Sequence, residues 1–169
     1  MVRRAGPIEH RTFHESAQES AESTGHPASQ NILVDYLLDT NACIALIEGD
    51  LPVVRRRFEE AVARGSRVYV PAIVAFELWY GVAKSSRLES NAKRVEKLFA
   101  GRVILLPFEE EDARTAGGIR AALEIAGKLI GPYDLLIAGQ ALRRDLTLVT
   151  ANVKEFRRLK TLRWEDWAT

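Results

Sequence analysis

Histidine is missing from most of this chain. The sequence has 169 residues, and its three histidines, His10, His14 and His26, all fall within the first 31. A Ser-His-Asp or Cys-His catalytic device, a histidine general base or a histidine-rich zinc site would have to recruit that segment, which the sequence disfavours. The chemistry is therefore expected from carboxylates, amides and hydroxyls, whose hard oxygen atoms suit Mg2+ or Mn2+.

Cysteine and long apolar runs are also scarce. Cys43 is the only cysteine, which excludes an intrachain disulfide and a zinc site built from several thiolates. No run approaches the roughly 20 consecutive apolar residues of a membrane-spanning helix, and the N-terminus lacks the apolar centre of a secretory signal. The expectation is a cytoplasmic protein without a membrane segment.

Neither sign of charge dominates. The chain has 24 Lys and Arg against 23 Asp and Glu, for a net charge of +1, so the overall charge says little about nucleic-acid binding. Consecutive arginines are more suggestive, and they occur at 55–57, 143–144 and 157–158. Such clusters are found on solvated helix faces and in phosphate-binding patches, and the sequence leaves both interpretations open.

Composition divides the chain near residue 31. Residues 1–31 are rich in Ser, Glu, Gln, His and Gly without hydrophobic periodicity, which predicts a flexible tail. Val34 is a candidate start of translation, because valine codons can initiate, and the native protein would then lack this tail. Recovery of residues before Val34 by N-terminal sequencing of natively expressed protein would contradict that hypothesis. Residues 32–169 are expected to form one domain.

Beyond the tail, short apolar runs alternate with helical patterns, which is typical of an α/β fold with a parallel sheet covered on both faces by helices. Five strands are expected near 36–38, 67–70, 103–106, 146–149 and 162–164. Pro71 and Pro132 suit the starts of two helices. The clearest helical stripe follows Glu109 and comprises Ala116, Ile119, Leu123, Ala126 and Ile130.

Three acidic residues interrupt apolar segments. Asp39 directly follows the first predicted strand, at the end where open α/β sheets bind ligands. Glu77 has apolar helical neighbours and no basic residue within helical reach, and Asp134 opens a predicted helix with Ile137 and Ala138 on the same face. Burying an unpaired carboxylate costs several kcal/mol, so such a group pairs with a cation, becomes protonated or binds a metal.

Each acid also has a structural explanation. Asp39 could cap the next helix, Asp134 could be stabilised by helix N-terminal amides, and Glu77 could pair with an arginine distant in sequence. Convergence favours chemistry, because Asn152 adds a neutral oxygen after another predicted strand. A divalent cation would remove repulsion between converging carboxylates, hold a phosphodiester oxygen and activate water. The residues thus predict a Mg2+- or Mn2+-dependent site that acts on a phosphodiester.

The segments that carry these residues resemble the PIN-domain ribonucleases, specifically the VapC-type toxins of bacterial type II toxin–antitoxin pairs. The matching segments are 37–41, 77–81, 130–138 and 147–152, in the same order and spacing, and the resemblance covers about residues 34–167. It implies an α/β/α sandwich, Mg2+-dependent cleavage of RNA with Mn2+ as a substitute ion, and a homodimer. It also implies inhibition by a VapB-like antitoxin, which often inserts a basic side chain among the carboxylates.

Carried over residue by residue, the resemblance makes Asp39, Glu77 and Asp134 the catalytic and metal-binding acids. The fourth metal position of the family falls on Asn152, and the supporting residues are Thr150 and Asn41. Because that position is often Asp in the family, the neutral Asn152 lowers the negative charge of the site and would weaken metal binding, although many members carry the same residue and are expected to remain active.

Three other classes of protein would account for some of these residues. A phosphatase of the haloacid dehalogenase type would need a second Asp two residues after Asp39, where Asn41 stands. A receiver-like signalling module would need an acidic pair ahead of its phosphoacceptor and a lysine in place of Asn152. A catalytically silent module of the same fold that binds a partner stays open, and the sequence does not select among tRNA, rRNA and mRNA as substrates.

Overall fold

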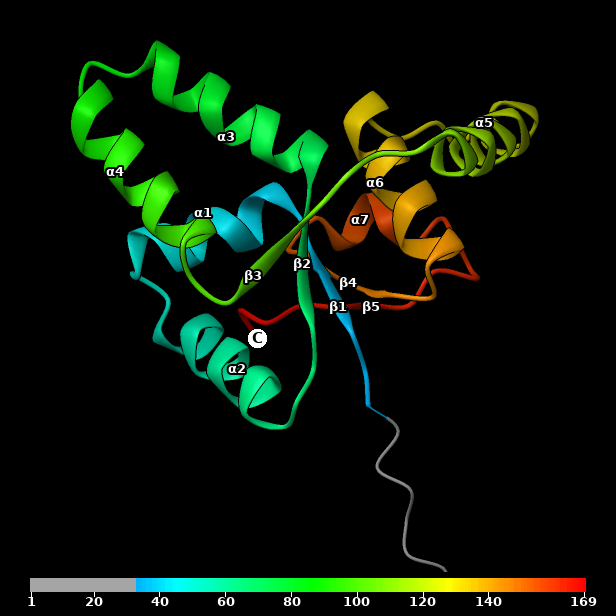
Figure 1. The fold of residues 1–169 in the computed structure, drawn as a ribbon. Coiled ribbons are helices and arrows are strands. Elements are labelled where there is room, and N and C mark those ends of the chain that lie inside the picture. The colour runs from blue at the N-terminus through cyan, green and yellow to red at the C-terminus, as the bar shows by residue number, and fades with distance from the viewer. Residues whose placement is uncertain (1–32) are drawn as a thin grey trace, which may run out of the picture. The chain divides into compact units, whose positions relative to one another are not determined.

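Five short strands form one parallel sheet in this computed structural model, which describes residues 33–169 (Figure 1). The strands lie in the order β3-β2-β1-β4-β5. Their bounds are β1 Tyr36–Leu38, β2 Val68–Pro71, β3 Val103–Leu106, β4 Thr147–Val149 and β5 Trp164–Glu165. The predicted tail at 1–31 lies outside the described residues.

Helices make the connections, as parallel strands require. Their bounds are α1 Thr40–Glu48, α2 Pro52–Ala63, α3 Ala72–Lys84, α4 Leu88–Phe99, α5 Glu110–Ile125, α6 Pro132–Arg143 and α7 Val153–Phe156. Two helices lie between each pair of consecutive strands up to β4, and the short α7 precedes β5. Within residues 33–169, no helix combines the length and apolar character needed to cross a membrane.

Both faces of the sheet are packed. Leu37 and Leu38 follow one another in β1, and both are fully buried; Leu148 and Val149 of β4 are buried in the same way. Successive side chains of a strand point to opposite faces, so their joint burial requires cover on both sides. The predicted α/β fold, a helix-covered parallel sheet of five strands, is confirmed.

The strand order creates a switch point beside β1. From β1 the chain adds β2 and β3 on one side, and it then crosses over to add β4 and β5 on the other. Open α/β sheets bind ligands outside the carboxyl ends of strands at such a point. The backbone N–H of Asp39 donates to the carbonyl of Val149 over 3.0 Å, which holds the carboxyl ends of β1 and β4 side by side.

Pro71 and Pro132 lie at the starts of helices, as predicted: Pro71 ends β2 and immediately precedes α3, and Pro132 is the first residue of α6. One local prediction was wrong. The apolar stripe after Glu109 ends early, because α5 stops at Ile125, Ala126 is exposed and Ile130 lies in the following loop. Gly127 adopts a φ of 63°, a left-handed conformation that glycine accepts readily and that ends helices.

Close packing of α5 against α6 positions the start of α6. A Cβ built on Gly139 of α6 would lie 2.7 Å from the Cβ of Ala116 in α5. Near the other end of α6, the Arg143 guanidinium bonds the carboxylate of Asp112, a fully buried residue of α5. These contacts fix the register of α6, whose first turn carries Asp134.

The substitution Gly139→Ala tests this packing. The added methyl group meets the backbone and Cβ of Ala116, so we expect a loss of about 1–3 kcal/mol in the free energy of unfolding, as for other overpacked cores. Gly118→Ala in α5 is the matched control, because a Cβ there meets nothing within 4 Å and alanine favours a helix by about 0.5–1 kcal/mol. Urea unfolding that ranks both variants equally stable would contradict this packing.

Candidate functional site

Asp39 lies between the carboxyl ends of β1 and β4 and is 4% exposed. Its carboxylate accepts a hydrogen bond of 2.7 Å from the backbone N–H of Ala42, and so it caps α1. The side chain of Thr150, the first residue after β4, also hydrogen-bonds Asp39. Asp39 therefore serves as a helix cap and at the same time lies at the strand ends where the sequence predicted chemistry.

Asp134 is tied to the start of α7. The side-chain amide of Asn152 donates to Oδ2 of Asp134 over 3.0 Å. The backbone N–H of Asn152 donates in turn to the Thr150 hydroxyl oxygen over 2.9 Å. A continuous set of hydrogen bonds thus runs from Asp39 through Thr150 and Asn152 to Asp134, which brings these four predicted site residues together.

Glu77 is less enclosed than its apolar neighbours suggested. It is half-buried on α3, and its carboxylate accepts a hydrogen bond from the Thr40 hydroxyl. Tyr80 and Gly81, one turn further along α3, are both exposed. Part of the apolar composition of α3 therefore lies on an exposed surface. Among residues 33–169, no lysine or arginine forms an ion pair with Glu77.

The supporting residue Asn41 contributes to the site through its backbone and not through its side chain. It is exposed, and its contact with Asp39 is made by the backbone N–H. Thr40, in contrast, is not one of the predicted site residues. Its bond to Glu77 connects the start of α1 with α3.

A further carboxylate, Glu155, was missed in the sequence. Its Oε2 accepts a hydrogen bond of 2.8 Å from the backbone N–H of Gly131, and its charge adds to burial in raising the pKa of Asp134. The available signal was its position three residues after Asn152, in the first turn of a helix that follows a strand end.

Burial and repulsion raise the pKa of two of these acids to about 6. Burial is the larger cause for Asp39, the charge of Asp134 adds to it, and hydrogen bonds from Thr150 and Ala42 oppose it. Burial also leads for Asp134, followed by the charges of Glu155 and Glu77. Asp134 therefore interacts electrostatically with Asp39, Glu77 and Glu155, and we call these four residues the carboxylate cluster.

The chemistry of the carboxylate cluster fits a hard divalent cation. Its oxygen atoms, with those of Asn152 and Thr150, are the ligands that Mg2+ and Mn2+ prefer. As the side chains lie, no three acidic, histidine or cysteine residues within 33–169 are grouped closely enough to hold an ion. Neighbouring hydroxyl and amide groups bond the carboxylates instead. A cation would relieve the repulsion that raises the pKa of Asp134.

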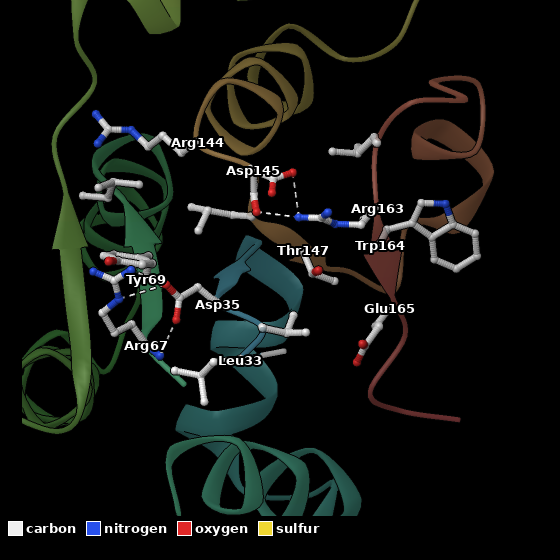
Figure 2. Close-up of a pocket in the computed structure, with 14 residues that line it drawn as sticks. Leu33, Asp35, Arg67, Tyr69, Arg144, Asp145, Thr147, Arg163, Trp164 and Glu165 are labelled. Carbon is white, nitrogen blue, oxygen red and sulfur yellow. Dashed lines mark hydrogen bonds and ion pairs between the residues drawn. The ribbon is translucent and has the colours of Figure 1, made fainter. Parts of the chain in front are cut away.

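A cavity of about 820 Å3 lies at the opposite edge of the sheet, near the amino ends of the strands (Figure 2). The charges of its walls are largely satisfied by one another. Arg67 pairs with Asp35 at 2.5 Å, and Arg163 pairs with Asp145 at 2.8 Å. None of the predicted site residues lines this cavity. The carboxylate cluster, and not this cavity, is therefore the candidate functional site.

Known proteins resemble this chain over most of its length. The PIN domain family model matches residues 36–162. The tRNA(fMet)-specific endonuclease VapC of Salmonella typhimurium is 39% identical over 135 residues, which cover 80% of this chain and 99% of that protein. Ribonuclease VapC2 of Rickettsia felis is 37% identical over 132 residues, covering 78% of this chain and 97% of that protein.

Solved structures agree with these relatives. VapBC2 from Rickettsia felis, bound to a DNA fragment from its promoter, matches with a TM-score of 0.74 and 34% identity, covering 79% of this chain and 99% of that one. DNA-bound VapBC from Salmonella typhimurium matches with a TM-score of 0.73 and 38% identity, covering 79% and 98%. The chain therefore belongs to the PIN-domain family. Within that family it groups with the VapC ribonucleases, which confirms the resemblance seen in the sequence.

The raised pKa of Asp39 predicts a pH-dependent stability in the absence of metal. A carboxyl whose pKa rises from 3.8 to about 6 on folding stabilises the protein below pH 3.8, and this contribution is lost as the pH rises through 6. From pH 5 to 7.5 the loss is about 1.4 kcal/mol. Asp39→Asn removes this titration. The free energy of unfolding of the variant, relative to that of the unsubstituted protein, should therefore be about 1.4 kcal/mol higher at pH 7.5 than at pH 5.

Urea unfolding in EDTA at both pH values measures this difference. Asp50→Asn, at an exposed carboxylate in the loop between α1 and α2, is the control. An Asp39→Asn difference that stays constant between pH 5 and 7.5 would contradict the raised pKa.

Proposed function

We propose that this protein is a Mg2+-dependent endoribonuclease and the toxin of a type II toxin–antitoxin pair, with Mn2+ as a substitute ion. The observation that carries the proposal is the carboxylate cluster. Its acids come from β1, α3, α6 and α7, and they interact through Asp134 at the carboxyl edge of the sheet. Similarity to VapC ribonucleases over nearly their whole length supports RNA as the substrate.

The residues of the site divide into ligands and residues that position them. Asp39, Glu77 and Asp134 would hold the ion, as the family resemblance implies, with Asn152 beside them. When bound, the ion would neutralise charge on the scissile phosphate and make a water molecule more acidic for in-line attack. Thr150 hydrogen-bonds Asp39, and the Asn152 amide orients Asp134.

An apolar groove beside Glu77 supports an inhibitory protein partner. Its volume is about 220 Å3, and Ile44, Leu78 and Val95 line it from α1, α3 and α4, with Glu77 at its wall. A partner that combines an apolar segment with a basic side chain would fill the groove and pair with the acid. We propose that a VapB-like antitoxin inhibits the enzyme in this way; both solved relatives described above are VapBC proteins.

The substrate and the location follow from the same proposal. One relative is named for tRNA(fMet), so tRNA is the first substrate to test. We propose the cytoplasm as the site of action, because RNA and an antitoxin would be met there. The homodimer that the resemblance implies stays a prediction.

Cleavage of a tRNA pool tests the proposed reaction. We expect cleavage with Mg2+, none in EDTA, and a loss of about 100-fold or more in Asp39→Ala, since even outer-shell partners of a metal contribute 10–100-fold. Arg56→Gln, an exposed change on α2, should retain activity. Metal-independent cleavage, or full activity in Asp39→Ala, would contradict the mechanism. Binding of an antitoxin-like partner without cleavage of tRNA, rRNA or mRNA would favour the silent binding module.

Glu155→Gln tests the carboxylate that the sequence did not reveal. Glutamine keeps an oxygen for the Gly131 N–H but removes a charge next to Asp134. The Mg2+ concentration that gives half-maximal cleavage should therefore rise about 10-fold. Glu124→Gln, at a carboxylate on α5 paired with Arg120, is the control. An unchanged Mg2+ requirement in Glu155→Gln would limit Glu155 to a structural role.

A further inference from the structure

The arginine clusters noted in the sequence differ in what they contact. In the first cluster, Arg55 donates to the carbonyl of Leu46 over 3.0 Å, and Arg57 donates to that of Thr169 over 2.9 Å. In the second cluster, Arg143 and Arg144 form ion pairs that join α6 to the start of α5, with Glu109 and Asp112. Both clusters are thus engaged in holding the fold together.

The third cluster, Arg157 and Arg158, has no acidic partner within the described part of the chain. It lines a cavity of about 430 Å3, and the other lining residues are Gly127, Lys128, Lys154 and Lys160. Five of the six lining residues are basic and none is acidic. We call this surface the basic cavity. Like charges gathered in one hollow repel one another, and a polyanion is the ligand that relieves this repulsion.

The chain segment after Asn152 is built to present these cations. Phe156, Leu159 and Leu162 are buried at every third position and anchor the segment to the core. Lys154, Arg157 and Lys160 recur with the same spacing and are exposed. The buried side chains hold the segment against the core, so the basic side chains stay together on the surface.

The basic cavity adjoins the carboxylate cluster. Glu155 of the cluster lies between Lys154 and Arg157 on the same short segment. The loop from α5 to α6 carries Lys128 and leads into Asp134, and two bonds fasten it to α7 and the residues after it. These bonds run from the Gly131 N–H to Glu155 and from the Arg158 guanidinium to the Leu129 carbonyl. A chain of phosphates lying in the basic cavity therefore passes next to the carboxylates.

We propose that the basic cavity binds backbone phosphates of the RNA substrate next to the scissile bond; this inference rests on the proposed nuclease function. Four carboxylates repel a phosphodiester chain, and one bound cation neutralises only its own surroundings. Lys128, Lys154, Arg157 and Lys160 would offset that repulsion at neighbouring phosphates. Phosphate contacts carry no base information, so the basic cavity sets affinity and register and leaves base choice to other surfaces.

The double variant Arg157→Gln/Lys160→Gln tests the proposal. The probe is labelled tRNA from a mixed pool, bound in EDTA so that no cleavage occurs, between 50 and 200 mM salt. The slope of log K against log salt is negative, and losing two phosphate contacts should reduce its magnitude by about 1.4–1.8. The Kd at 100 mM salt should rise at least 10-fold. With Mg2+, KM should rise while kcat changes less than 2-fold.

The matched control is Arg56→Gln/Arg64→Gln, which removes the same charge from two exposed arginines of the α2 region. It should bind tRNA as the unsubstituted protein does. Lys128→Gln/Lys154→Gln gives a second test in case the first variant does not fold.

Affinity and salt slope in the folded cavity variants that equal those of the control would overturn the proposal. Tighter binding to duplex DNA of equal length than to tRNA would also overturn it. Because the binding assay needs no cleavage, an inactive but RNA-binding protein would refute the nuclease function while the comparison of affinities still decides the role of the basic cavity.

Discussion

Buried negative charge around Asp134 is the constraint on which the carboxyl end of the sheet depends. Burial raises the pKa of Asp134, and the charges of Glu155 and Glu77 add to it; burial also leads for Asp39, where the charge of Asp134 contributes. A fold selected for stability alone would separate such groups or pair them with arginine. Within residues 33–169, none of the ion pairs involves an acid of the carboxylate cluster. A divalent cation, bound by hard oxygen ligands, would supply the missing positive charge.

The fold brings these groups together from elements that are distant in sequence. β1 and β4 are neighbours at the switch point, and they bring Asp39 next to Thr150. Close packing of α5 on α6 sets the place of Asp134, and α7 adds Asn152 and Glu155. The same α7 segment continues into the basic cavity. Members of the carboxylate cluster and of the basic cavity are thus neighbours in this segment of the chain.

Much of the fold was readable in the sequence, because strands buried on both faces are continuous apolar runs and the expected strands fall within two residues of the observed ones. Asp39 and Asp134 were found because a strand end and a helix start mark them. The half-burial of Glu77 could not be predicted, since exposed and core apolar residues look alike in a sequence. Glu155 was missed because its partner Gly131 lies 24 residues away. The arginine clusters differ in their bonds to residues 9 to 112 positions away, so only the structure could distinguish them.

The central claim is that the carboxylate cluster binds a divalent cation. Calorimetric titration of the metal-free protein with Mn2+ at pH 6, in buffers of different ionisation enthalpy, tests it most directly. Because the pKa of Asp39 and that of Asp134 are about 6, binding should release protons, and Asp134→Asn should abolish both the binding and the proton release. Absence of binding, or equal binding by Asp134→Asn, would contradict the account.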